Sequence, residues 1–236
     1  MPTSVTLPPN WRPLPTAGGS EPTVFRSAAL SLATVEELST CPSELTWFDL
    51  RIPAEVELDP QVEYPPTLRH RNTPLLDPEV TIIQGQKASM LQDLIDGTTT
   101  FGSGYIDMLE AAPERFAATL EALATVDGPV VIACQGGRDR SGLVSALLLS
   151  LAGTPREAVI ADYVATNANL ASDLARQPTG DMGDIMAQLD LTCRESDIEM
   201  VLDHLDSRGG IRGYLAPVLS EDRIDRLQVW ARERLS

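Results

Sequence analysis

The sequence is poor in lysine, aromatic residues and cysteine, and its composition excludes several classes of partner and site. Its 236 residues carry 18 Lys and Arg against 34 Asp and Glu, a formal net charge of −16. Because such a chain repels a phosphate backbone, we expect no nucleic-acid partner, and an anionic membrane surface is disfavoured for the same reason. Lys87 is the only lysine beside 17 arginines, so arginine takes the place of lysine throughout the chain.

The three cysteines, Cys41, Cys134 and Cys193, are odd in number and far apart, so a secreted disulfide scaffold is not expected. With only His70 and His204 available, no group of residues has the spacing of a structural zinc site. We therefore expect neither a metal nor a cofactor.

No segment predicts insertion into a membrane. The longest apolar stretch, Leu143–Ala152, is far short of the roughly 20 residues that a spanning helix needs. Residues 1–19 have neither a basic start nor an apolar core, so we do not expect a signal peptide. These features predict a cytoplasmic protein without stable membrane insertion, whose oligomeric state does not follow from the sequence.

Residues 1–22 are rich in Pro, Gly, Ser and Thr and predict an extended arm, followed by a single domain over 23–236. Short apolar runs in this domain predict strands at 23–26, 45–50, 68–73 and 130–133. The last run, Val130–Ala133, is apolar throughout and follows a Gly-Pro turn. That pattern is typical of a central parallel strand buried on both faces.

Helical spacing fills the intervals between these runs. Thr34 and Glu37 form the pattern of a capping box, and residues 80–126 are predicted helical with a break at Gly97–Gly104. Ser141–Leu151 is apolar on nearly every face, as a buried helix is. A final amphipathic helix is expected to carry Ile224, Leu227, Ala231 and Leu235. We expect an α/β fold with a central, mostly parallel sheet flanked by helices and additional helices in the middle and C-terminal regions.

One segment carries the chemistry: residues 130–143 read VVIACQGGRDRSGL. A strand-to-helix turn of this length can fold its backbone N–H groups inward as an anion nest, and the following helix directs its positive end to the same point. Gly136 and Gly137 let the backbone approach a ligand closely. Arg140 can add a bidentate grip on two phosphate oxygens.

Cys134 ends the strand at the floor of this turn, six residues before Arg140. The positive field of the turn favours a thiolate, which can attack the phosphorus of a bound phosphate and form a phosphocysteine. The spacing alone is a weak signal, but the buried strand before it, the two glycines inside it and the apolar helix after it make it specific. Cys41 and Cys193 have no arginine at that distance and are interpreted as core or incidental residues.

The segment CQGGRDRSG resembles the signature loop of the protein tyrosine phosphatase superfamily, and more narrowly that of atypical bacterial tyrosine and lipid phosphatases, whose loop reads roughly HCxxGKDRTG. Further likenesses to that family are Asn10-Trp11-Arg12, Phe25–Leu30, Asp49-Leu50-Arg51 with Glu55, and Asp162-Tyr163. The resemblance implies a tyrosine-phosphatase-like fold. It covers the chain from about residue 10 to residue 235 and is weakest after residue 170.

The resemblance implies a role for each loop residue. Cys134 would be the nucleophile, Arg140 would bind the phosphate and Ser141 would donate a hydrogen bond to the thiolate. Asp139 matches the aspartate proposed as general acid. Arg138 matches a lysine that gives some relatives access to phosphoinositides with a second phosphate. The remaining residues expected to bind substrate are Gln135, Gly136 and Gly137.

Two residues outside the loop are further candidates. Asp49, at the end of a predicted strand, is an alternative general acid or the ion-pair partner of a neighbouring arginine. Arg12 contacts the loop or a substrate, or it forms a structural salt bridge. For Asp139 too, an ion pair with Arg138 is the alternative to the acid role.

The leading hypothesis is hydrolysis of phosphate monoesters through a phosphocysteine, with a phosphorylated protein, above all phosphotyrosine, as substrate; phosphoserine, phosphothreonine or a phosphoinositide are alternatives. Ala133 stands where the family has a histidine that orients the loop, and Pro13 replaces an aspartate. These departures leave open a catalytically weakened phosphate-binding module. A sulfur-transferring rhodanese-like enzyme is disfavoured, because the Arg-Ser-Gly ending of the loop matches phosphatases better.

Overall fold

The computed structural model describes residues 7–16, 21–58, 64–76, 92–170 and 190–235. Its centre is a five-stranded sheet with the strand order β1-β2-β5-β3-β4. The strands are β1 (Arg12–Pro13), β2 (Val24–Ala28), β3 (Thr46–Asp49), β4 (Arg69–Asn72) and β5 (Val130–Cys134). Only β1 is antiparallel to its neighbour, so the prediction of a mostly parallel sheet is confirmed.

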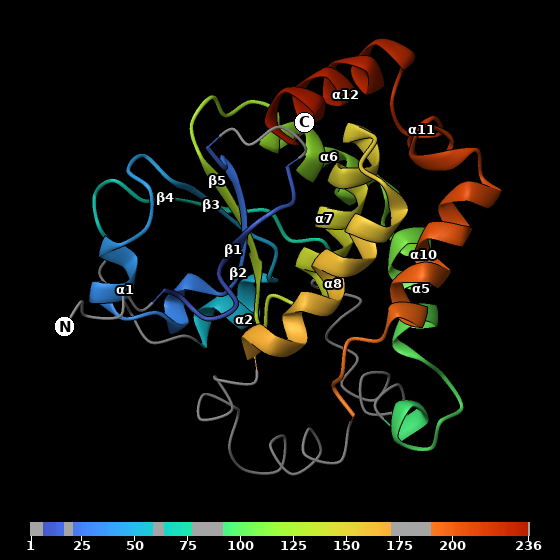
Figure 1. The fold of residues 1–236 in the computed structure, drawn as a ribbon, viewed down its shortest axis with the longest axis horizontal. Coiled ribbons are helices and arrows are strands. Elements are labelled where there is room, and N and C mark those ends of the chain that lie inside the picture. Colours follow the sequence, from blue (N-terminus) through green and yellow to red (C-terminus); the bar gives the residue numbers. More distant parts are fainter. Residues whose placement is uncertain (1–6, 17–20, 59–63, 77–91, 171–189, 236) are drawn as a thin grey trace.

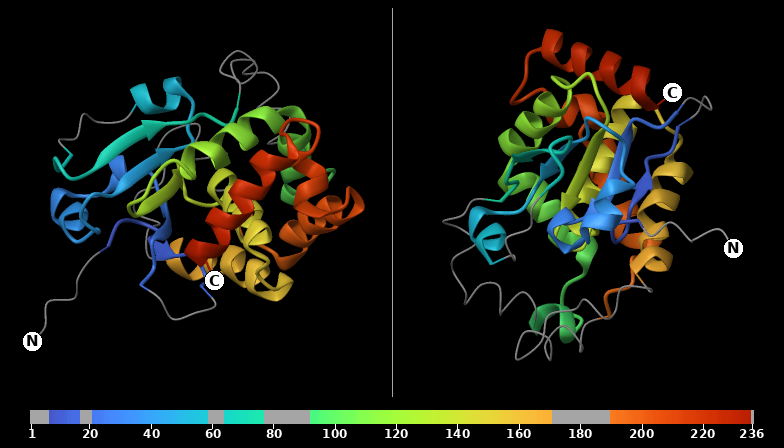
Figure 2. Two further views of the ribbon diagram at one scale, coloured as in Figure 1. Left: turned by 90° about the horizontal axis from the view of Figure 1, so that it is seen from above. Right: turned by 90° about the vertical axis from the view of Figure 1, so that its left-hand side faces the viewer.

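Helices account for most of the remaining described chain (Figure 1). They are η1 (Leu30–Leu32), α1 (Val35–Ser39), α2 (Pro53–Glu57), α5 (Phe101–Ala111), α6 (Pro113–Leu123), α7 (Asp139–Ala152), α8 (Arg156–Leu170), α10 (Glu195–Ser207), α11 (Gly210–Leu215) and α12 (Glu221–Leu235). The described helices from α5 onward gather on one side of the sheet, as the two views of Figure 2 also show; they are α5, α6, α7, α8, α10, α11 and α12. None of the helices in the described ranges combines the length and the apolar character needed to cross a membrane.

Alternate residues of β5 face two separate hydrophobic clusters. Val130, Ile132 and Cys134 join the large cluster formed with the helices on the α7 side. Val131 and Ala133 join a smaller cluster on the other face, where α1 packs. Every residue of β5 is buried, which confirms the predicted central strand. The alternation also places Cys134 on the α7 side of the sheet.

Several local predictions are confirmed. The Thr34 side chain accepts a hydrogen bond from Glu37 N, at 3.2 Å, and the Glu37 carboxylate accepts one from Thr34 N, at 2.7 Å, which together form the capping box. In α12 the buried residues are the four apolar ones at helical spacing. Helix α7 begins two residues earlier than the apolar pattern indicated, at Asp139.

The predicted break at Gly97–Gly104 is wrong in its second half, because α5 already begins at Phe101. Gly102 lies inside this helix, where α5 packs closely on α10. A Cβ atom at Gly102 would come within 2.9 Å of the Asp197 backbone, and the Gly102 N–H donates to the Asp197 carboxylate at 3.1 Å. The glycine therefore permits close packing of two helices instead of ending one. The first part of the predicted helical range, 80–91, lies outside the described residues.

Candidate functional site

The loop of residues 135–138 joins the end of β5 to the start of α7, at the carboxyl ends of three neighbouring parallel strands. In open α/β sheets this edge is where ligands bind. Gln135 is exposed at the mouth of the loop, whereas Gly137 and Arg138 are buried. The chain order of a buried strand, a short turn and a buried helix thus puts this loop at the centre of the sheet edge.

The loop carbonyls are held from behind by side chains of the N-terminal segment. The Gly137 carbonyl accepts from Asn10 Nδ2 at 2.7 Å and from Arg26 Nε at 3.1 Å. The Arg138 carbonyl accepts from Arg26 Nη2 at 2.8 Å, and the Gln135 carbonyl accepts from the backbone of Ala29 at 3.3 Å. In a planar trans peptide, C=O and N–H point in opposite directions. The N–H groups that follow these carbonyls therefore turn toward the other side of the loop.

Those N–H groups are open to a ligand. No residue in the described part of the chain accepts a backbone hydrogen bond from residues 135–138. The first amide to bond back within α7 is that of Gly142, which donates to the Arg138 carbonyl at 3.1 Å, so the amides of residues 139–141 belong to the unpaired first turn. Such a ring of donors suits an anion. Within the described ranges, His, Cys, Asp and Glu form no group of three that could hold a metal ion.

Gly137 has a conformation that a side chain would prevent. Its φ is +66°, and a Cβ atom would lie 2.5 Å from the carbonyl oxygen of Ser27 on β2. At Gly136, by contrast, a Cβ atom would meet nothing within 4 Å. Of the two loop glycines, Gly137 is the one that allows the loop to lie against the neighbouring strand.

Cys134 is buried at the base of the loop, with 2% of its surface exposed. Its Sγ lies 3.6 Å from the Oγ of Ser141, which is fully buried in the first turn of α7. The sulfur therefore sits between the end of the strand and the start of the helix, within hydrogen-bond reach of one hydroxyl.

Arg140 is held by Glu55 of α2 in a two-pronged ion pair. Its Nη1 and Nη2 donate to the two carboxylate oxygens of Glu55 at 2.5 Å and 2.8 Å. Burial by itself would lower the pKa of Arg140, but the hydrogen bonds to Glu55 and the nearby Cys134 raise it. The guanidinium is thus fixed in direction and fully charged beside the sulfur.

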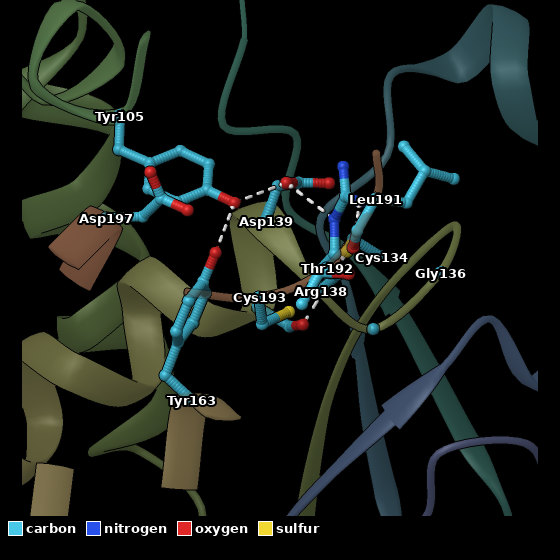
Figure 3. A network of polar contacts seen from close by, with 12 residues as sticks. Tyr105, Cys134, Gly136, Arg138, Asp139, Tyr163, Leu191, Thr192, Cys193 and Asp197 are labelled. Atoms are coloured by element: carbon cyan, nitrogen blue, oxygen red, sulfur yellow. Dashed lines mark hydrogen bonds and ion pairs between the residues drawn. The ribbon is translucent and has the colours of Figure 1, made fainter. Parts of the chain in front are cut away.

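Asp139 receives two hydrogen bonds on the same oxygen (Figure 3). The Tyr105 hydroxyl donates to Oδ1 at 2.6 Å, and Arg138 Nε donates to it at 3.0 Å. Burial alone would raise the pKa of Asp139, but the charge of Arg138 and these two hydrogen bonds hold it below the ordinary value. Asp139 is therefore a carboxylate in this state of the protein, and the ion pair with Arg138 anticipated for it is present.

The Arg138 side chain is directed away from the mouth of the loop. Its Nη1 donates to the Leu191 carbonyl at 2.9 Å, and its guanidinium lies 4.4 Å from the centre of the Phe101 ring. Only 11% of the side chain is exposed. Arg138 is thus committed to contacts within the protein, and the expected contact with a substrate stays a prediction.

Asp49 is ion-paired, which was the alternative to a role as general acid. Arg51 donates to it from Nε at 2.9 Å and from Nη2 at 2.7 Å, and His70 Nε2 lies 3.2 Å away. Burial would raise the pKa of Asp49, but these contacts with Arg51 and His70 lower it. Arg51 Nη1 also reaches the side chain of Gln135, at 3.1 Å. Asp49 therefore supports the loop indirectly, because it holds the Arg51 guanidinium that donates to Gln135.

Arg12 forms a structural salt bridge, which was the alternative to contact with substrate. Its Nε lies 3.1 Å from Asp162 Oδ1, and Asp162 Oδ2 lies 2.6 Å from Nη1 of the fully buried Arg26. Burial and the charge of Arg26 lower the pKa of Arg12 to about 10. Arg12 also contacts the side-chain oxygen of Asn10. It thereby orients the amide that holds the Gly137 carbonyl.

The site contains four further residues that the sequence patterns did not predict as part of it: Asn10, Arg26, Glu55 and Tyr105. Three of them lie in segments that resemble the family, but nothing in the sequence indicated what they touch. Tyr105 had no signal beyond its place in a helical stretch. Each of the four contacts the loop or the first turn of α7 and lies far from it in the sequence, so spacing along the chain could not reveal the contact.

Comparison with known proteins points in one direction. A family model described as the tyrosine phosphatase family matches residues 17–231, nearly the whole chain. A tyrosine-protein phosphatase of Nostoc commune is 26% identical over 85 residues, which are 36% of this chain and 29% of that protein. The aligned part of the chain thus spans less than a third of this relative.

Replacing Gly137 by Ala should lower the free energy of unfolding by about 2 to 3 kcal/mol, because the added Cβ strains a left-handed residue and meets the β2 backbone. Gly136→Ala is the matched control and should change stability by less than about 1 kcal/mol. Urea denaturation followed by circular dichroism measures both. Equal effects of the two substitutions would contradict the assignment of the close approach to Gly137.

Replacing Asp162 by Ala should destabilise the protein by about 3 kcal/mol or more, because Arg26 and Arg12 are then buried without their counter-charge. Asp203→Ala is the control, since Asp203 pairs with Arg156 at the surface and has 72% of its side chain exposed. Its removal should cost less than about 1 kcal/mol. A loss for Asp162→Ala as small as that of the control, measured by denaturant titration, would show that the buried pair does not hold the loop.

Proposed function

The chain belongs to the tyrosine phosphatase family, and we propose that it hydrolyses phosphate monoesters at residues 134–140, the loop with its flanking residues, through a phosphocysteine intermediate. The observation that supports this most directly is the loop itself. Its carbonyls are tied back, its amides are free to bind an anion, and the sulfur of Cys134 lies at its base beside the charged Arg140. These are the parts that phosphoryl transfer to a thiolate requires.

Binding uses the amides of the loop and the guanidinium of Arg140. The phosphate oxygens accept hydrogen bonds from the amides of the loop and the first turn of α7, whose positive end points at them. Glu55 keeps the guanidinium in place before the substrate arrives. Because these donors are positioned in advance, they stabilise the charge on the transferring phosphoryl group without rearrangement.

Chemistry then proceeds in two balanced steps. Asp139, a carboxylate in the free protein, first takes up a proton from solvent as the negative phosphate binds next to it. In the first step, the Cys134 thiolate attacks phosphorus, an S–P bond forms, and the bond to the leaving oxygen breaks as Asp139 gives that oxygen this proton. In the second, water attacks the phosphocysteine, Asp139 takes a proton from the water, and the S–P bond breaks to return the thiolate and free phosphate. The Ser141 hydroxyl, 3.6 Å from the sulfur, donates a hydrogen bond to the thiolate as it leaves.

The proposed substrate is a phosphorylated protein, with phosphotyrosine first and phosphoserine or phosphothreonine next. The position of Arg138 favours this over a phosphoinositide with a second phosphate. That side chain is occupied by Asp139, by the Leu191 carbonyl and by the face of Phe101. Reaching a second phosphate would require it to give up three contacts.

Ala133 favours a second candidate, a module that binds phosphate without hydrolysing it. The side chain at this position packs into the small apolar cluster behind the sheet, so it cannot orient the loop by a hydrogen bond. Asn10, Arg26 and Arg51 hold the loop by other contacts. These contacts make the missing histidine a smaller loss, which supports the enzyme over the binding module.

The proposal predicts that Cys134→Ser reduces hydrolysis of p-nitrophenyl phosphate by about 1,000-fold or more, because a hydroxyl in this setting is a far weaker nucleophile than a thiolate. Tungstate binding, measured by calorimetry, should persist in the variant. Cys41→Ser is the matched control and should retain activity, since Cys41 lies in the small cluster away from the loop. Wild-type protein that binds tungstate without turnover would support the binding module, and thiocyanate formed from thiosulfate and cyanide would support a rhodanese.

The acid role of Asp139 predicts a dependence on the leaving group. Asp139→Asn should slow hydrolysis of phosphotyrosine by about 100-fold or more, because the phenolate must leave without a proton. Hydrolysis of 2,4-dinitrophenyl phosphate, whose leaving group needs no proton, should change by less than about 10-fold. Asp107→Asn, at an exposed position of α5, is the control and should leave both rates unchanged. An equal loss on the two substrates would remove Asp139 from the acid role.

A further inference from the structure

A chain of hydroxyl groups runs from the helical side of the core to the loop (Figure 3). Tyr105 of α5 is buried, and its hydroxyl lies 2.6 Å from Asp139 Oδ1. The same hydroxyl lies 2.8 Å from that of Tyr163 on α8. Because a carboxylate can only accept, Tyr105 must donate to Asp139, and its oxygen is then free to accept from Tyr163. The direction of both hydrogen bonds is thereby set.

We propose that Tyr105 is a positioning residue, which aims the carboxyl group of Asp139 and keeps it ionised until substrate binds. The proposal rests on the proposed function, in which Asp139 is the general acid. It adds a residue on a helix remote in sequence from the loop, whose hydroxyl acts on the reaction only through Asp139.

The geometry supports the aiming role. In the described part of the chain, both hydrogen bonds to Asp139 end on Oδ1, one from Tyr105 and one from Arg138. Oδ2 is therefore the oxygen that carries the transferred proton. Since Oδ1 accepts in the neutral carboxylic acid as well as in the carboxylate, the two donors hold the group in one orientation through both protonation states.

The charged groups around Asp139 support the second part of the proposal, that Tyr105 keeps the carboxyl group ionised until substrate binds. Arg138 and Arg140 come from its own loop and helix, and Tyr105 comes from α5. Behind Tyr105 lie Tyr163 and Cys193, the latter in the segment that precedes α10. Burial would raise the pKa of Asp139, but Arg138 and the hydrogen bond from Tyr105 outweigh it. A bound phosphate adds negative charge to the same loop and opposes these effects, so the carboxylate gains its proton as substrate binds.

A second buried tyrosine allows a structural role to be separated from a positioning role. The hydroxyl of Tyr214 on α11 donates to the backbone carbonyl of Leu109 on α5 at 3.0 Å. It is as buried as Tyr105 and its hydrogen bond reaches the same helix. Tyr214→Phe therefore removes one buried hydroxyl from the core without touching Asp139.

The test compares pH profiles of kcat/KM for phosphotyrosine in wild type, Tyr105→Phe and Tyr214→Phe. Activity requires protonated Asp139, so it falls as pH rises through the pKa of that group. Loss of one hydrogen bond to a carboxylate should move this alkaline limb upward by about one pH unit in Tyr105→Phe. The rate at the optimum should fall by about 10-fold for phosphotyrosine and by much less for 2,4-dinitrophenyl phosphate. Tyr214→Phe should leave the limb in place.

A second substitution at residue 105 keeps the test valid if Tyr105→Phe fails to fold. Placing 3-fluorotyrosine at residue 105 keeps the ring and strengthens the hydroxyl as a donor, so the alkaline limb should move downward. If neither substitution at residue 105 moves the limb while Asp139→Asn abolishes it, the role of Tyr105 is refuted and the acid role of Asp139 stands. If Asp139→Asn keeps the limb and the leaving-group dependence, the acid role itself fails.

Discussion

The site depends on where the loop carbonyls point. A peptide unit cannot turn its N–H and its C=O to the same side, so tying the carbonyls of residues 135–138 outward aims their amides inward. Arg26 supplies two of the three side-chain hydrogen bonds that do this for Gly137 and Arg138, and it is itself neutralised by Asp162. A buried ion pair on one face of the loop thus aims the amides toward the other face, where we propose that the anion binds.

Two more buried or half-buried ion pairs lie around the site. Arginines are paired with carboxylates behind or beside the loop: Arg26 with Asp162, Arg51 with Asp49 and Arg140 with Glu55. Each pair cancels its own charge. The positive potential at the loop therefore does not require an excess of basic residues, and it is compatible with the net charge of −16 of the whole chain. In the proposed function, the ring of amides and the helix end attract the phosphate, aided by one arginine whose direction is set by its partner.

The residue proposed as general acid, Asp139, and the residue expected to contact a second phosphate, Arg138, bind to each other. Arg138 bonds to Asp139 and stacks on Phe101, and Tyr105 of the same helix α5 bonds to Asp139 from the other side. Helix α5 therefore contacts Asp139 at the start of α7, the residue that the proposed chemistry needs in two protonation states. Under the proposed function, Arg138 serves the acid rather than the substrate, and the proposed preference for one phosphate follows from the contact that also holds the acid.

The sequence by itself determined four of the five strands, the capping box at Thr34, the amphipathic α12 and the strand–loop–helix unit around Cys134, because each depends on neighbours within a few residues. It did not determine β1, which lies in the predicted arm and forms by pairing with β2. It did not determine that Gly102 packs inside a helix, or whether Asp49 and Arg12 face substrate or an ion pair. Those outcomes were decided by contacts between residues separated by tens of positions, such as Tyr105 with Asp139 at 34 residues and Arg12 with Asp162 at 150. Only the folded chain brings such groups within hydrogen-bond distance, where the partners of Asp139 hold its pKa below the ordinary value despite burial.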